Sequence, residues 1–432
     1  MGTPKRHLYE LVHSLSPSEK QKFLERAFQH KRGRYANYVQ LFNAIEEQEE
    51  FNDEAIRQRF KNEKFVRQLH QTKNYLYHRI LDFIREAHFD EETELHGLLE
   101  KIKILHEKSL FHHLNLFMKK AIGLAERMED FQARIKLLRF ERVALLQNRT
   151  QAGTVDALDR LHQMEREVLH KSNRLTELQQ LVDRIQVELS VPGIDRKARI
   201  GKFWEHDLLR NPVKAASIGE EIERLNSKFY LNQFAGNFNG CVEVNEKLVA
   251  IYEQYPGLLA DHVRFKRYLE TVYNLAASYI FLNRFPEAQN TIAKLAASKD
   301  RKRRAPVMVF EREAKFSIAF ARKRLDFEDG HTSILQIESR LDKFRSRVDR
   351  RNEIEICHLA GVFYLNFAKP ELALKWVLRN RNRKIDQYRP DLLSRWALRA
   401  APTSSQPRAP ASPGKRDSSW RSWGQRTLKR AR

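Results

Sequence analysis

Apolar residues recur at helical spacing along most of this chain. The stretch from Glu63 to Ala87 has the most regular pattern of its half, and it predicts one continuous amphipathic helix. Polar side chains occupy its opposite face. The apolar positions, separated by three or four residues or by sums of these, are Phe65, Leu69, Leu76, Ile80 and Phe83.

Two helix starts can be read from capping residues. Ser16 is followed by a proline suited to the first helical position and by Glu19, which together predict a capping box. Asn52 precedes two acidic residues, Asp53 and Glu54, and therefore predicts an N-cap for a short helix running to about Lys61.

The spacing of helices and breaks predicts an all-α protein in four parts. Residues 1–92 form an N-terminal helical module, and residues 93–192 form long helical hairpins that end at the helix-breaking sequence SVPG. Residues 193–394 contain short helices separated by tight turns. Residues 395–432 are rich in Ala, Pro, Ser and Arg, and this composition predicts disorder.

One kind of helix junction recurs in the second half. In NLAASYIFLNRFPEA (274–288) a helix ends at a short turn, and the next helix begins near Phe285. Similar turns precede Phe238, Phe327 and Pro370, so the steps are 47, 42 and 43 residues. Weaker copies precede Phe111 and Phe131. Recurrence at such steps predicts stacked antiparallel helix pairs.

The residue types in the 274–288 unit suit a helix pair. Ala276 and Ala288 allow close approach, and Tyr279 fills the space between the helices. Asn283 tolerates the left-handed conformation that ends a helix, and Pro286 suits a first turn.

These residues resemble the tetratricopeptide repeat family. Leu275, Ala276, Tyr279, Phe285, Ala288 and Ile292 stand at that family's packing positions, as do Gly361, Tyr364, Ala373 and Val377 in GVFYLNFAKPELALKWV. The family's step is about 34 residues, so the longer steps lie nearer those of HEAT and armadillo repeats. The layout is also similar to that of large, uncharacterised bacterial helical-repeat proteins. The resemblance implies a right-handed solenoid with an extended groove.

The formal charge of +23 favours anionic partners. Basic runs span Lys299–Arg304, Arg345–Arg351 and Arg379–Lys384, and cations near helix C-termini also have a structural role. Near Ser394 the pattern changes abruptly. Either the reading frame shifts there or the chain has a genuine basic tail.

No chemistry-bearing motif stands out. The chain has neither a phosphate-binding glycine loop nor HExxH or GxSxG. The densest histidine group is His106, His112 and His113, but His112 and His113 lie on different sides of a helix, so they do not suit a metal site. Cys241 and Cys357 fit packing positions. We therefore expect no catalytic site, cofactor or metal, and a cytoplasmic protein without a membrane span.

Two functions remain. The first is a scaffold that binds a peptide or protein along its groove, with Asn274, Ser278 and Lys315 as exposed contact residues on the first helices of the pairs. The alternative is a nucleic-acid-associated regulator. Its N-terminal helix-turn-helix would present Arg67, Gln71 and Asn74 to a DNA groove, and its repeats would act as a sensor.

Overall fold

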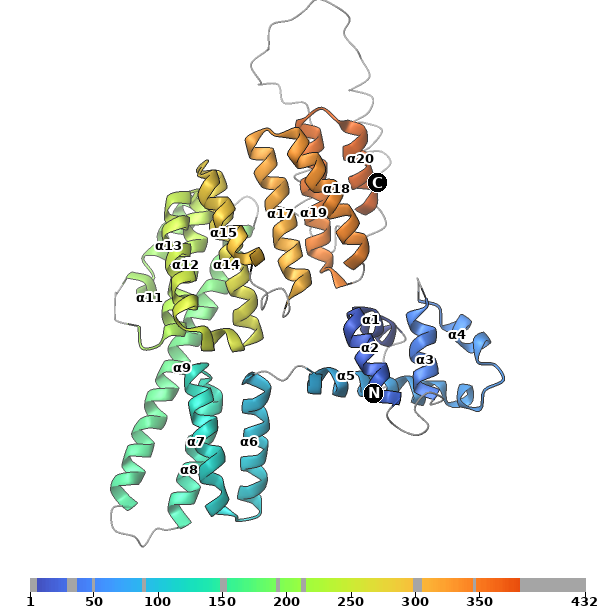
Figure 1. Cartoon of the computed structure of the whole chain (residues 1–432). Coiled ribbons are helices and arrows are strands. Elements are labelled where there is room, and N and C mark those ends of the chain that lie inside the picture. The colour runs from blue at the N-terminus through green and yellow to red at the C-terminus, as the bar shows by residue number, and fades with distance from the viewer. Residues whose placement is uncertain are drawn as a thin grey trace, which may run out of the picture. The chain divides into compact units, whose positions relative to one another are not determined.

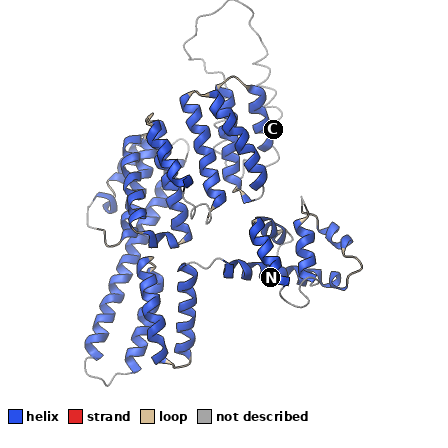
Figure 2. Cartoon of the chain, viewed as in Figure 1, coloured by secondary structure: helices blue, strands red, loops and turns tan. Residues whose placement is uncertain are grey.

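The computed structural model describes residues 6–28, 37–48, 51–87, 91–147, 154–191, 195–210, 215–297, 305–344 and 347–380. Every regular element in these residues is a helix, as Figure 2 shows, which confirms the all-α expectation. None of these helices is both long enough and apolar enough to cross a membrane. The chain divides into two compact units, Met1–Val309 and Phe310–Arg432, and each is described by itself.

The N-terminal module, whose helices are drawn in blue in Figure 1, has its own hydrophobic core. Its helices are α1 (His7–Ser14), α2 (Pro17–Phe28), α3 (Asn37–Glu46), α4 (Asp53–Arg59), the 3-10 helix η2 (Lys64–Gln68) and α5 (Leu69–Ala87). Both predicted starts are confirmed. Ser16 and Glu19 exchange the two hydrogen bonds of a capping box at 2.7 and 3.3 Å, and Asn52 Oδ1 accepts the Ala55 N–H at 2.9 Å.

Longer helices follow in the same unit. They are α6 (Glu91–Glu107), α7 (Phe111–Arg127), α8 (Phe131–Gln147) and the 37-residue α9 (Thr154–Ser190). Each packs against the next along the chain, and α9 also packs against α12 (Ile218–Ala235). The first half of α9 has no fully buried residue, because burial along this helix begins at Leu178.

The remainder of the first unit consists of shorter helices packed in sequence. They are α10 (Arg196–Trp204), α11 (Asp207–Arg210), α12, α13 (Phe238–Gln254), the 3-10 helix η3 (Pro256–Ala260), α14 (His262–Phe281) and α15 (Phe285–Ala297). Helix α12 contacts α13, α13 contacts α14, and α14 contacts α15. The predicted packing residues Ala276, Tyr279 and Ala288 are buried.

The second unit holds two more helix pairs. Its helices are α17 (Pro306–Arg324), which begins just before the unit boundary, α18 (Phe327–Phe344), α19 (Arg350–Asn366) and α20 (Pro370–Asn380). Tyr364 and Ala373 are buried as expected, whereas Val377 is half-buried and its neighbour Trp376 takes the core position.

Six helix-to-helix turns share one geometry. In each, a residue with positive φ follows the helix, and the residue after it donates its N–H to the carbonyl five positions back at 2.8–3.1 Å. This is the Schellman ending. The positive-φ residues are Ser109, Glu129, Gly236, Asn283, Leu325 and Ala368. The turns predicted before Phe111, Phe131, Phe238, Phe285, Phe327 and Pro370 are therefore confirmed.

The phenylalanine after a turn also joins neighbouring helix pairs. Phe238, at the start of α13, stacks on Phe281 at the end of α14 with ring centroids 4.2 Å apart. Phe327, at the start of α18, contacts Phe363 of α19 and Phe367 just after that helix, with ring centroids 6.1 and 5.5 Å apart. A ring at this position thus contributes apolar contact between one pair and the next.

Gly330 permits a close approach between two helices of the second unit. A Cβ atom at this position would lie 2.3 Å from Cζ of Phe363, whose side chain is fully buried. In a helix, alanine normally stabilises relative to glycine by roughly 0.5–1 kcal/mol. Because the clashing Phe363 ring is fully buried, we expect Gly330→Ala instead to destabilise α18 and α19 by about 1–3 kcal/mol.

Hydrogen exchange of the α18 and α19 amides measures this change. Gly97→Ala in α6 is the matched control, because no neighbouring atom lies within 4 Å of its Cβ position. We expect that control to be neutral or stabilising. Equal protection in Gly330→Ala and wild type would contradict the close packing.

Candidate partner-binding surface

The buried polar side chains lie almost entirely on the first helix of each pair, meaning α12, α14, α17 and α19. Only Asn245 of α13 departs from this rule among the described residues. Burying a charge is costly unless it is paired. The residues on the first helices are Glu220, Glu223, Arg224, Ser227, Thr271, Ser278, Glu311, Arg312, Lys315, Glu353 and His358.

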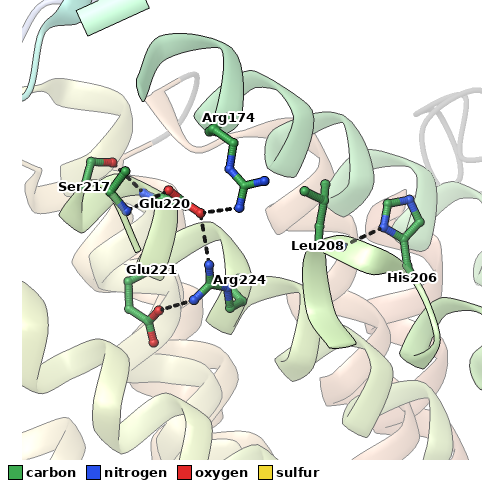
Figure 3. A network of polar contacts seen from close by, with 8 residues as sticks. Arg174, His206, Leu208, Ser217, Glu220, Glu221 and Arg224 are labelled. Atoms are coloured by element: carbon green, nitrogen blue, oxygen red, sulfur yellow. Dashed lines mark hydrogen bonds and ion pairs between the residues drawn. The ribbon is translucent and has the colours of Figure 1, made fainter. Parts of the chain in front are cut away.

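The start of α12 is held by a network around Glu220 (Figure 3). This carboxylate is 1% exposed and accepts hydrogen bonds from Arg174 of α9 at 2.8 Å and from Arg224 at 3.0 Å. The Ala216 N–H donates to it at 2.9 Å. Burial opposes ionisation, but these donors outweigh it, so the pKa of Glu220 lies below its ordinary value.

The turn between α7 and α8 inserts into the same region. Its Glu129 carboxylate accepts the N–H groups of Ile218 and Gly219 at 2.8 and 2.6 Å, at the positive end of the α12 dipole. Arg264 of α14 donates to the Met128 carbonyl. The α7–α8 turn therefore connects the starts of α12 and α14.

An ion pair joins the next two first helices. Arg267 of α14 pairs with Glu223 of α12, and Asn226 donates to the same carboxylate at 3.1 Å. Burial raises the pKa of Tyr230, and the charge of Glu270 acts in the same direction. These groups are thus neighbours, and together with Asn274 they form what we call the inner strip: Asn226, Tyr230, Arg267, Glu270 and Asn274.

The inner strip retains polar groups without an internal partner. Asn226, Tyr230, Arg267 and Asn274 are half-buried, and Glu270 is exposed. Within the described part of the chain, neither the Tyr230 hydroxyl nor the Asn274 side-chain amide has a hydrogen-bond partner. A phenol and an amide can both donate and accept, so these two groups can bind the backbone of a peptide.

A comparable network links α17 and α19 in the second unit. Lys315 Nζ donates to Asn352 Oδ1 at 2.7 Å and to Glu355. Asn352 in turn donates to Glu311 at 2.6 Å. Burial lowers the pKa of Lys315, and the charge of Arg312 adds to this effect against that of Glu355.

Two of the three predicted contact residues are not exposed. Ser278 is 4% exposed, because its hydroxyl donates to the Asn274 carbonyl of its own helix at 2.7 Å and can then be buried among helices. Lys315 is 2% exposed and belongs to the α17–α19 network. The expectation of exposure was wrong for both residues, and Asn274 alone remains accessible.

The predicted helix from Glu63 to Ala87 is also corrected. It begins as the 3-10 helix η2 and becomes α5 only at Leu69, so Arg67 lies on a different element from Gln71 and Asn74. Arg67 and Gln71 are exposed, and Asn74 is half-buried.

A hollow between α2, α3 and α5, lined by Tyr38 and Phe83, has a volume of about 20 Å³, enough for about one water molecule.

Most of the net charge lies outside the described residues. Those other segments hold 26 of the 79 basic residues but 7 of the 56 acidic ones, which leaves 53 basic and 49 acidic residues in the described helices. Residues 381–432 contribute 14 basic and 3 acidic residues to this imbalance. Several predicted features also lie outside the described ranges: the Lys299–Arg304 run, most of the Arg379–Lys384 run, Ser394 and the predicted tail. The described helices are therefore close to neutral.

Catalytic or metal-binding chemistry gains no support from the described residues. Cys241 and Cys357 are buried free thiols, and burial raises the pKa of Cys241 to about 11. No group of three or more His, Cys, Asp or Glu side chains in those residues could hold a metal ion. Comparison of the chain with protein-family descriptions, curated proteins and solved structures finds no match.

Proposed function

We propose that the protein is a non-enzymatic helical-repeat scaffold that binds a peptide or protein partner. In this proposal the helix pairs stack as a right-handed solenoid like that of tetratricopeptide repeats, and the partner lies along the inner strip. The main support is the pair of unmatched groups, Tyr230 and Asn274, on adjacent first helices. A repeat surface of this kind suits extended or helical segments.

Capture from a cytoplasmic extract of the source cells, with and without nuclease, tests the scaffold. Tyr230→Phe combined with Asn274→Ala removes both unmatched groups while leaving the Glu223–Arg267 pair in place. We expect loss of two such hydrogen bonds to lower capture about tenfold or more. Nuclease should have no effect on capture by the wild-type protein.

Lys247→Ala is the matched control, because this exposed residue lies on the second helix α13 and, among the described residues, forms its ion pair with Glu243 of the same helix. We expect it to capture the same partner as wild type. If the Tyr230/Asn274 variant also retained that partner in full, the inner strip would not be the binding surface.

A second candidate is a nucleic-acid-associated regulator. It is favoured by the succession of α4, a hydrogen-bonded turn and η2–α5, which has the order of a helix-turn-helix. Arg67 and Gln71 are both exposed at the start of the second arm. If Arg67→Ala together with Gln71→Ala left specific DNA binding unchanged, base recognition by this arm would be refuted.

A further inference from the structure

Exposed basic side chains recur at every third position from the turn before α5 into the first turn of that helix. We call Lys61, Lys64, Arg67 and His70 the basic row, and all four are exposed. Lys64 and Arg67 lie within η2, where residues three apart lie on the same side of the helix. They are separated by about 6 Å along the helix axis.

The core side of the turn holds the basic row outward. Phe60, Phe65 and Leu69 are buried in the N-terminal core, and the rings of Phe60 and Phe65 are 5.1 Å apart. The Glu63 N–H donates to the Phe60 carbonyl at 2.8 Å, which closes the turn. Because the apolar residues fix the backbone, the intervening cations face solvent in a defined arrangement.

The side chains of the basic row also have no counterion within the described residues. None of the four takes part in an ion pair within the described residues. Acids of the module are paired elsewhere, as Asp53 is with Arg57 and Lys73. Glu63 is the single acid within the row. Since the described helices are nearly neutral, this local excess does not follow from a generally basic surface.

We infer that the basic row binds the phosphate backbone of duplex DNA. The inference deepens the nucleic-acid candidate and is independent of the scaffold. About 6 Å between Lys64 and Arg67 approximates two base-pair steps of about 3.4 Å along one strand. The amides of Asn62 and Gln68 suit phosphate and sugar contacts. Recognition of anionic lipids takes clusters of about four to eight Lys or Arg, more than the three in this row. The row positions the protein on the duplex without reading its sequence.

Titration of a labelled DNA duplex with the full chain at several salt concentrations tests this inference. The variant is Lys61→Gln, Lys64→Gln and Arg67→Gln together. Each phosphate contact contributes about 0.9 to the slope of the logarithm of the binding constant against the logarithm of the salt concentration. Loss of three contacts should therefore make this slope shallower by about 2.7 and lower the affinity at 0.1 M salt roughly 500-fold. Glu63→Gln should increase affinity several-fold, because it removes the single acid of the row.

A variant with the same charge change in the 381–432 segment, Arg421→Gln, Arg426→Gln and Arg430→Gln, controls for net charge. Unchanged affinity and salt slope in the row variant, with wild type still binding, would overturn the inference and leave the nucleic-acid candidate standing. Failure of the wild-type protein to bind the duplex at low salt would overturn both the basic-row inference and the nucleic-acid candidate. Binding only to phosphatidylserine vesicles, lost in the row variant, would also overturn the DNA assignment.

Discussion

Glu220→Ala is expected to destabilise the α9–α12 region by about 3–5 kcal/mol, the cost of removing one partner from a buried ion network. The carboxylate is 1% exposed and receives Arg174, Arg224 and the Ala216 N–H. Its removal leaves Arg224, with a side chain 9% exposed, inside the protein without its closest acceptor. We expect faster hydrogen exchange of the backbone amides at the start of α12 and a lower melting temperature of the protein.

Glu221→Ala provides a matched control in the adjacent position. Its side chain is 39% exposed and contacts the same Arg224 at 3.2 Å, so its loss should cost less than about 1 kcal/mol. Similar destabilisation by the two substitutions would show that Glu220 contributes no more than a surface pair.

The pH dependence of Glu220 has a definite sign. Because its pKa in the folded protein is below the ordinary 4.5, the unfolded chain binds the proton first as the pH falls. The stabilisation that ionised Glu220 contributes is complete above the pKa of its carboxyl in the unfolded chain. It disappears as the pH falls through the lower pKa of the folded protein. The difference in unfolding free energy between wild type and Glu220→Gln should therefore shrink in acid.

Lys315→Ala is expected to destabilise α17 and α19 by about 3 kcal/mol. It leaves Asn352 and Glu355 without their donor and empties the space of a side chain that is 2% exposed. We place the effect at the lower end of the range for buried pairs, because the Glu355 side chain is 30% exposed and can contact water. Hydrogen exchange of the two helices measures the loss.

Lys315→Met separates charge from packing, since methionine fills much of the same space. Lys375→Met on α20 is the matched surface control: its side chain is 58% exposed and pairs with Glu338 at 2.7 Å, so we expect less than about 1 kcal/mol. If Lys315→Met were as mild as Lys375→Met, the buried charge would not determine α17–α19 stability.

Local chemistry made the turns readable from sequence. The capping box at Ser16 and the N-cap at Asn52 involve side chains and backbone groups a few residues apart, so short motifs predict them. Glycine was a poor guide to the helix ends, because five of the six positive-φ residues are not glycine. The phenylalanine after the turn was the better signal, since it joins successive helix pairs.

The exposure of polar side chains was harder to predict from the sequence than the turns were. Ser278 and Lys315 have the residue types of a surface, and one helix alone does not show which neighbour surrounds them. Glu311 and Lys315 stand four residues apart with the charged Arg312 and Glu313 between them, so the local pattern did not signal a buried network. The unmatched groups at Tyr230 and Asn274 gave no sequence signal, because their environment comes from helices far apart in the chain.

The amino-acid sequence alone determined the helical class, the two capped helix starts at Ser16 and Asn52, and the recurring turns, because these depend on spacing and hydrogen bonds within a few residues. The predicted boundaries near residues 92, 192 and 394, the repeat class and the partner remain predictions. Tertiary structure decided which polar residues are buried, where η2 replaces an α-helix, and which cations lack counterions. These properties depend on packing between helices, which brings together residues that no local pattern connects.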